Sequence, residues 1–233
     1  MHWFYDPNVS SHSTEISKTE LIHFKSLRIV AGDQIGVTSG KGLGFVARVV
    51  DPARGDVQIL EELTSTHPPK VHLFQAIAKG DRDESALQAC VELGISGATA
   101  FQAERSVSNW SSKVDKQLAR WDQIAISAIK QSQQLYLPSI SYEPSAAKLR
   151  PVGVGLILDP TAEQGISTVT TADQYSVVVG PEGGFSQSEL LTLESNGFER
   201  VRLGRSVLRT STAGVVAISA LQLLSGEYGG RLG

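Results

Sequence analysis

The residues best suited to bind a ligand lie in one run, Val177-Val178-Val179-Gly180-Pro181-Glu182-Gly183-Gly184-Phe185-Ser186. The apolar stretch Tyr175–Val179 has the length of a strand that is buried on both faces, and it leads directly into this glycine-rich turn. Glycines at the carboxyl end of a parallel strand let backbone amides approach a ligand closely. An ordinary turn into a helix needs only one proline and one glycine, so the extra glycines favour a binding loop. Ser186 and Glu189 then have the spacing of a capping box, which predicts that a helix begins there.

A second polar segment, Leu203–Gly214, precedes an apolar helix that we expect over Val215–Leu224. Ser and Thr commonly cap helices, which would account for the run from Thr210 to Thr212. Four arginines nearly alternate with apolar residues in and before this segment: Arg200, Arg202, Arg205 and Arg209. They could form a solvated face, but their concentration supports a patch that faces phosphate groups at least as well.

The histidines limit the chemistry further. All five lie in the first third of the chain: His2, His12, His23, His67 and His72. We therefore expect no histidine in the C-terminal α/β domain, and so neither a local Ser-His-Asp triad nor a His-rich metal site there.

Two domains are expected to position these residues, residues 1–68 and 70–233, divided at the prolines of His67-Pro68-Pro69-Lys70. Short strands in the first domain favour a small β-barrel. These strands are Gln34–Thr38, Gly44–Val50 and Asp56–Leu60. The run Gly40-Lys41-Gly42-Leu43-Gly44 leads into a strand and not a helix, so it predicts a hairpin turn rather than a phosphate-binding loop.

After the prolines, strands and helices alternate, which is typical of an α/β domain with a mainly parallel sheet. The expected strands are Val71–Ala78, Ala98–Gln102, Val152–Leu158 and Tyr175–Val179, and the expected helices are Asp81–Leu93 and Lys113–Leu135. Cys90 lies in the first of these helices, where we expect a small buried apolar residue rather than a nucleophile.

The composition and net charge indicate the class of protein and its partner only weakly. The chain has 233 residues, 41% of them hydrophobic, and a net charge of −3, which is typical of a soluble globular protein. Its apolar runs are far short of the roughly 18 residues of a membrane span, so we expect a cytoplasmic protein. A negative charge argues against a nucleic-acid partner. That charge is an average, however, because several acids lie apart from the arginines along the chain: Glu61, Glu62, Asp159, Glu163 and Asp173.

Together these segments resemble the SPOUT superfamily of methyltransferases. More narrowly they resemble the RsmE family, bacterial enzymes that methylate N3 of a uridine in small-subunit ribosomal RNA. The strongest matches are Gly180–Phe185 and Leu203-Gly204…Leu208-Arg209-Thr210…Thr212-Ala213. Supporting matches are His23…Leu27-Arg28…Gly32-Asp33, Lys79-Gly80-Asp81, Glu92-Leu93-Gly94-Ile95, Glu104-Arg105-Ser106-Val107, Arg120-Trp121 and Gln131-Ser132…Pro138.

The resemblance implies an N-terminal PUA-like RNA-binding β-barrel and a C-terminal α/β domain that is tied into a trefoil knot. It also implies a homodimer that binds S-adenosylmethionine and acts on 16S ribosomal RNA or the small ribosomal subunit, with neither a metal nor a membrane. The cofactor residues would be Leu158, Gly180, Pro181, Gly183, Gly184, Leu203, Gly204, Leu208, Thr210 and Ala213. The RNA-binding candidates are Arg28, Lys79, Arg105 and Arg120.

Arg209 is the candidate catalytic residue, because a guanidinium suits the negative charge that develops on uracil carbonyl oxygens. An ion pair with Glu182 or a contact at the helix end would be the structural alternative for Arg209. Many relatives carry an acidic residue at Ser211 and an arginine at Gln134, so we assign no acid or base role to Ser211 and no RNA contact to Gln134. Two other functions stay open: methylation of another ribosomal or transfer RNA base, and a non-catalytic RNA-binding role in ribosome assembly.

Overall fold

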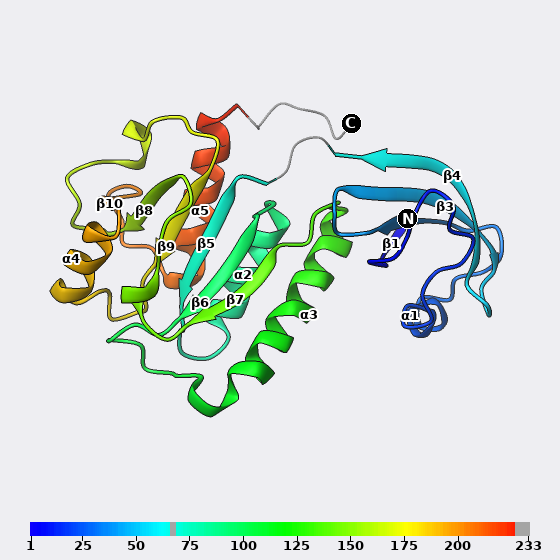
Figure 1. Cartoon of the computed structure of the whole chain (residues 1–233), viewed down its shortest axis with the longest axis horizontal. Helices are drawn as coiled ribbons and strands as arrows, with labels where there is room; N and C mark the ends of the chain where they lie inside the picture. Colours follow the sequence, from blue (N-terminus) through cyan, green and yellow to red (C-terminus); the bar gives the residue numbers. More distant parts are fainter. Residues whose placement is uncertain (66–68, 227–233) are drawn as a thin grey trace. The chain divides into compact units, whose positions relative to one another are not determined.

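The computed structural model describes residues 1–65 and 69–226, which form two compact units (Figure 1). The first unit contains residues 1–65 together with Ile126–Leu137, and the second contains residues 69–125 and 138–226. The expected division assigns residues 126–137 to the C-terminal domain, whereas the structure groups them with the N-terminal one. His67 and Pro68 of the expected linker lie outside the described residues.

A four-stranded sheet forms the first unit. Its order is β1 (His2–Tyr5), β2 (Gln34–Thr38), β3 (Leu43–Asp51) and β4 (Asp56–Thr64). The first pair is parallel and the other two are antiparallel. Gly40 and Gly42 have φ values of 71° and 89° in the turn between β2 and β3, which confirms the predicted hairpin. The short helix α1 (Leu21–Ser26) packs Phe24 edge-on against Phe4, and closure of the sheet into a barrel stays a prediction.

The end of the long helix α3 (Val114–Ser132) joins the first unit through main-chain hydrogen bonds just beyond the helix. The Gly42 N–H donates to the Leu135 carbonyl at 2.8 Å, and the Leu137 N–H donates to the Gly40 carbonyl at 2.9 Å. These bonds explain why this segment groups with the N-terminal sheet, although the helical pattern of the sequence continues unbroken into it.

Six strands form the sheet of the second unit, and every neighbouring pair is parallel. Their order is β10 (Phe198–Val201), β8 (Val154–Leu158), β9 (Tyr175–Val179), β5 (Val71–Ala76), β6 (Gly97–Phe101) and β7 (Ser139–Glu143). The predicted α/β class is therefore confirmed. The sequence pattern predicts the four inner strands and misses β7 and β10, which are the two edge strands.

Helices α2 (Arg82–Glu92) and α5 (Thr210–Leu224) pack together on one face of this sheet. A Cβ atom added at Gly214 would lie 3.3–3.4 Å from the side chains of Leu73, Cys90 and Val179, so strand and helices are in close contact there. Cys90 is fully buried, as predicted. Three short helices complete the elements: η1 (Ser111–Lys113), η2 (Ala146–Lys148) and η3 (Ile166–Thr168).

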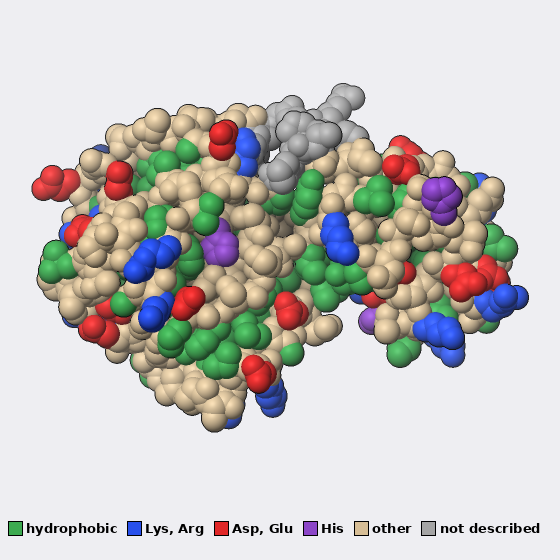
Figure 2. Space-filling model, viewed as in Figure 1, with side chains coloured by type: hydrophobic (Ala, Val, Ile, Leu, Met, Phe, Trp, Pro, Cys, Tyr) green, Lys and Arg blue, Asp and Glu red, His purple; other side chains and the backbone are tan. Residues whose placement is uncertain are grey.

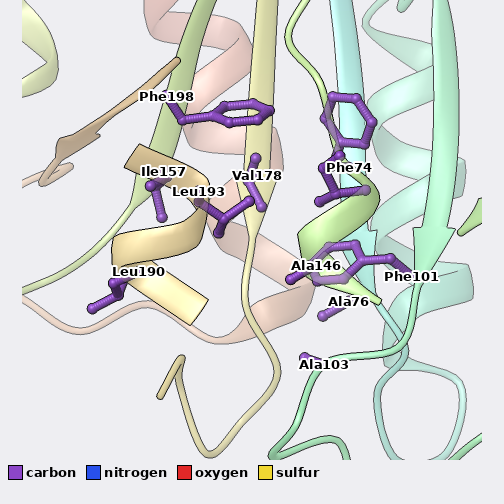
Figure 3. Close-up of a cluster of buried hydrophobic side chains, with 11 residues drawn as sticks. Phe74, Ala76, Phe101, Ala103, Ala146, Ile157, Val178, Leu190, Leu193 and Phe198 are labelled. Carbon is purple, nitrogen blue, oxygen red and sulfur yellow. The ribbon is translucent and has the colours of Figure 1, made fainter. Parts of the chain in front are cut away.

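The opposite face is covered by α4 (Gln187–Ser195) and η2, which enclose the core shown in Figure 3. Phe74 of β5 packs edge-on against Phe198 of β10 with ring centroids 5.9 Å apart, and Leu193 of α4 packs into the same cluster. Because the six strands are parallel, the segments that follow them lie at one edge of the sheet, where ligands bind in α/β folds.

Candidate active site

The glycine loop, residues 180–186, follows β9 and leads into α4. The Gly184 N–H donates to the Pro181 carbonyl at 2.9 Å, and Gly184 has a φ of +65°, which side chains rarely adopt. The Ser186 hydroxyl accepts from the Glu189 N–H at 3.1 Å, and the Glu189 carboxylate accepts from the Ser186 N–H at 2.9 Å. The predicted capping box is confirmed, and it fixes the exit of the glycine loop.

Two other glycines of this loop lie against side chains. A Cβ atom at Gly180 would lie 2.9 Å from the Phe185 ring, and one at Gly183 would lie 3.1 Å from the Cβ atom of Arg105. The Arg105 guanidinium also donates to the Gly183 carbonyl at 3.1 Å. The loop after β6, which carries Arg105, therefore shapes the glycine loop.

The arginine loop, residues 202–209, follows β10 and leads into α5. Thr210 joins it to the glycine loop, because its hydroxyl donates to the Gly180 carbonyl at 2.9 Å and accepts from the Gln75 amide at 2.9 Å. Thr210 is buried, and Gln75 is fully buried. The interpretation of Thr210 as a helix cap is wrong, since Arg209 is the N-cap of α5 and the Thr210 hydroxyl bonds to the other loop.

The backbone of both loops is open where a ligand could approach. A Cβ atom added at Gly184 or Gly204 would meet no atom within 4 Å. Leu158 ends β8, which lies in the sheet between β10 and β9 and so between the two loops. These residues fit a cofactor that is held largely by main-chain groups.

The structure brings all ten predicted cofactor residues to this edge of the sheet or to the first turn of α5. They are Leu158, Gly180, Pro181, Gly183, Gly184, Leu203, Gly204, Leu208, Thr210 and Ala213. Leu158, Pro181 and Ala213 are buried, which offers apolar contact beside the open glycines.

Glu182 connects the glycine loop to the segment after β5. Its Oε1 atom accepts from the Arg82 guanidinium at 2.7 Å and from the Lys79 N–H at 3.2 Å. Burial opposes ionisation, but hydrogen bonds from its own N–H, Arg82 and Lys79 and the charge of Arg82 hold the pKa of Glu182 below its usual range. The suggested ion pair of Arg209 with Glu182 is wrong, and Arg209 forms no ion pair with any residue of 1–65 or 69–226.

The four arginines near the second loop have different surroundings. Arg200 pairs with Asp159 at 2.6 Å, so Asp159 does not lie away from the arginines, as its place in the sequence suggests. Burial opposes ionisation of Asp159, but hydrogen bonds from Thr161 and Arg200 and the charge of Arg200 outweigh it and lower the pKa of Asp159. Arg202 donates to the carbonyls of Ala162 and Glu163. A phosphate-facing patch is therefore reduced from four arginines to the exposed pair Arg205 and Arg209.

The predicted RNA-binding residues do not form one cluster. Lys79 and Arg105 lie beside the glycine loop. Arg120 forms a two-point ion pair with Glu84 at 2.5 and 2.6 Å, and Arg28 is exposed in the first unit after α1. On the visible face of each unit, basic side chains are interspersed with acidic ones (Figure 2).

One histidine corrects the sequence interpretation, because His72 lies on β5 in the middle of the α/β sheet. Its Nε2 atom is 2.8 Å from the Thr99 hydroxyl, and burial lowers its pKa to about 4. It stands near the amino end of the strand, whereas the two loops follow the carboxyl ends. The expectation of no histidine in the α/β domain is wrong, but His72 lies away from the site.

The sequence interpretation also missed Asp83, in the first turn of α2. Its carboxylate accepts from the Glu84 N–H at 3.0 Å, and burial raises its pKa to about 6 against the hydrogen bonds that favour ionisation. The side chain is nearly inaccessible to solvent. No sequence signal marks this carboxylate, because an acid in the first turn of a helix is ordinarily a solvated one.

In the described part of the chain, no three His, Cys, Asp or Glu residues are placed to hold a metal ion together. None of the helices in residues 1–65 and 69–226 is both long and apolar enough to span a membrane.

Comparison with known proteins identifies the class of protein to which the α/β unit belongs. Residues 65–222 match the RNA methyltransferase domain family, so the parallel sheet and its two loops belong to an RNA methyltransferase domain.

The chain belongs to the ribosomal RNA small subunit methyltransferase E family. It is 36% identical to the Mycobacterium bovis member over 217 residues, which cover 86% of this chain and 82% of that one. It is 31% identical to the Aquifex aeolicus member, over 95% and 99% of the two chains. The solved structure of the Neisseria gonorrhoeae enzyme bound to S-adenosyl methionine superimposes with a TM-score of 0.84 at 30% identity, covering 96% and 98%. A Legionella pneumophila methyltransferase with the same bound cofactor gives 0.84 at 29% identity, covering 95% and 97%.

Proposed function

We propose that this protein methylates N3 of a specific uridine in 16S ribosomal RNA. The names of its relatives support a small-subunit ribosomal RNA substrate. The cofactor is S-adenosylmethionine, which solved relatives carry. The observation that carries the proposal is the buried Thr210 hydroxyl, which ties the arginine loop to the glycine loop beside open backbone.

The ten residues at the carboxyl edge are assigned to the cofactor. S-adenosylmethionine supplies a methyl group that its sulfonium already activates, so the protein mainly has to hold the nucleophile in line. Gly184 and Gly204 offer main-chain groups, whereas Leu158, Pro181 and Ala213 offer apolar contact.

Arg209 is assigned to the uracil. N3 of uracil carries an imide proton and becomes a good nucleophile as that proton leaves. The guanidinium of Arg209, exposed at the N-cap of α5, would stabilise the negative charge that then develops on the carbonyl oxygens. The positive end of the α5 dipole acts in the same direction. His72 takes no part, because it lies near the opposite edge of the sheet.

RNA contacts are assigned to Arg28, Lys79, Arg105 and Arg120. Arg28 and Lys79 are exposed, whereas Arg105 and Arg120 would have to exchange the partners they now have. Neutralisation of a few phosphates makes binding fall with added salt, and a flat salt dependence would contradict this surface.

A PUA-like barrel over residues 1–68, a trefoil knot within residues 70–233 and a homodimer complete the proposal. Exposed apolar side chains on α5, Val216 at 37% and Leu223 at 67%, support a protein contact there. A ribosomal substrate implies action in the cytoplasm.

The test is methylation of small ribosomal subunits with labelled cofactor, followed by mapping of the modified nucleotide. A single label on N3 of one uridine is the expected result. Label on another ribosomal base or on transfer RNA would move the protein to a different SPOUT activity. Absence of cofactor binding by calorimetry would instead favour a non-catalytic assembly factor.

A further inference from the structure

Glu189 connects the end of the glycine loop to the loop that follows β6. Its Oε2 atom accepts from the Ser186 N–H at 2.9 Å, which is the bond that a capping box requires. Its Oε1 atom accepts from the Glu104 N–H at 2.8 Å, and Glu104 lies 85 positions away in the sequence. Because a capping box needs only one carboxylate oxygen, the second bond has no part in starting α4.

The Glu189 side chain is buried where it makes these bonds. The residue is only 6% exposed, and each of its two carboxylate oxygens has a main-chain N–H partner. Burial of a carboxylate is costly unless hydrogen bonds compensate for it, so the two bonds hold the side chain and both main-chain groups together. Glu189 therefore links two loops in a fixed position and is not a solvated surface charge.

Arg105 lies between two anchored neighbours in the loop after β6. The N–H of Glu104, on one side, is held by the buried carboxylate, and the hydroxyl of Ser106, on the other side, donates to the Ile77 carbonyl at 2.8 Å. The Arg105 side chain is exposed and donates to the Gly183 carbonyl at 3.1 Å. A long exposed side chain loses rotamer freedom when it makes such a bond, so the bond depends on a main chain that is already in place.

We propose that Glu189 is a positioning residue for the binding of S-adenosylmethionine. By holding the main chain next to Arg105, its carboxylate keeps the Arg105 guanidinium on the Gly183 carbonyl. The glycine loop then has its binding shape before the cofactor arrives, and binding does not have to order it. The inference rests on the proposed assignment of Gly183 and its neighbours to the cofactor, and it is independent of which RNA base is methylated.

The test is calorimetry of S-adenosylmethionine binding to the full chain with Glu189→Gln. Glutamine is accepted in a capping box, but its amide has only one oxygen, so the Glu104 N–H loses its acceptor. We expect cofactor affinity to fall about fivefold, as for the loss of one hydrogen bond, and turnover at saturating cofactor to stay within about twofold. Glu199→Gln, at an exposed carboxylate on β10, is the charge-matched control and should bind the cofactor as the wild type does.

Arg105→Ala shows whether Glu189 acts through Arg105. Alone it should also weaken cofactor binding about fivefold, and the double variant should bind no more than about twice as weakly as Arg105→Ala. Leu193→Val removes a methylene from the core on the same helix, so it lowers stability and should keep the wild-type cofactor affinity. This control separates positioning from a general loss of stability.

Wild-type cofactor affinity in Glu189→Gln would overturn the proposal, and so would two effects that multiply in the double variant. Normal affinity in both single variants would mean that the contact with Gly183 does not serve the cofactor, which contradicts the assignment of the glycine loop. Weakening by Arg105→Ala alone would leave that assignment standing and remove only the role of Glu189.

Discussion

The two loops of the site are held in different ways. The glycine loop has an internal hydrogen bond at Gly184, and it is bonded to the segments after β5 and β6 through Glu182 and Gly183. Residues 203–208 of the arginine loop, in contrast, make no hydrogen bond to any residue that the structure describes. That loop is bonded only near its two ends, through Arg202 and the Arg209 carbonyl.

This difference indicates that the two loops contribute differently to binding. A loop that is already fixed adds affinity without paying for its own ordering. A loop without such bonds loses conformational freedom when a ligand fixes it, and this loss lowers the affinity. The same freedom allows the loop to close over the bound molecule. We expect the glycine loop to be preformed and the arginine loop to be ordered by ligand.

Substitution of Thr210, whose hydroxyl connects the two loops, should have the largest effect on stability. Thr210→Val keeps the shape but removes the hydroxyl, so the Gln75 amide and the Gly180 carbonyl both lose a partner. We expect the free energy of unfolding to fall by about 2–4 kcal/mol, because the Gly180 carbonyl loses its donor and one N–H of Gln75 loses its acceptor, although the Gln75 amide keeps its bond to the Ala76 carbonyl. Urea denaturation measures this, and Thr210→Ser, which keeps the hydroxyl, is the control. An equal loss in both variants would show that the methyl group matters and the hydrogen bonds do not.

Asp83 tests the support of the glycine loop as a function of pH, since α2 also carries Arg82. Burial raises its pKa from 3.8 to about 6, so the folded chain holds a proton that the unfolded chain releases. Its contribution is fully present below pH 3.8 and is lost as the pH rises through about 6. Compared with Asp83→Asn, which stays neutral, the wild type should lose on the order of 2 kcal/mol between pH 4 and 8. A stability difference that does not change with pH would contradict this assignment.

Arg209 tests the arginine loop without disturbing the fold. Arg209→Ala should lower turnover at least about tenfold and leave cofactor affinity unchanged, because the guanidinium is assigned to the transition state. Arg205→Ala, at an exposed arginine of this loop that makes no hydrogen bond to a described residue, is the matched control. Steady-state kinetics with calorimetry separates the two quantities, and near-normal turnover in Arg209→Ala would remove its catalytic role.

Glu182 should give the smallest effect, because its ion pair with Arg82 is partly exposed. Glu182→Gln loosens the glycine loop from the segment after β5, and we expect cofactor affinity to fall about two- to fivefold. Calorimetry at two salt concentrations checks it, with Glu199→Gln as the control. A loss of cofactor affinity much larger than about fivefold would mean that the loop depends on this one contact.

The sequence predicts the inner part of the fold better than its edges. Gln34–Thr38 and Tyr175–Val179 have the predicted bounds, because buried strands carry apolar runs. The edge strands β7 and β10 mix polar and apolar residues, and β10 has only four residues, so neither stands out.

The functional site, like the fold, is only partly predictable from the sequence. Glycine content locates both loops, and the capping spacing locates the start of α4. The pairings of Thr210 with Gln75 and of Arg200 with Asp159 join residues 135 and 41 positions apart, and no local pattern in the sequence contains them. His72 lies within the predicted strand Val71–Ala78, so the predicted domain division itself places a histidine in the α/β unit.

Hydrogen–deuterium exchange with and without S-adenosylmethionine tests the difference between the loops most directly. Peptides from residues 180–186 should exchange slowly in the free protein and change little on binding, whereas those from 203–208 should exchange fast and become protected. Fast exchange in the glycine loop of the free protein, or an arginine loop that stays unprotected with bound cofactor, would contradict the account.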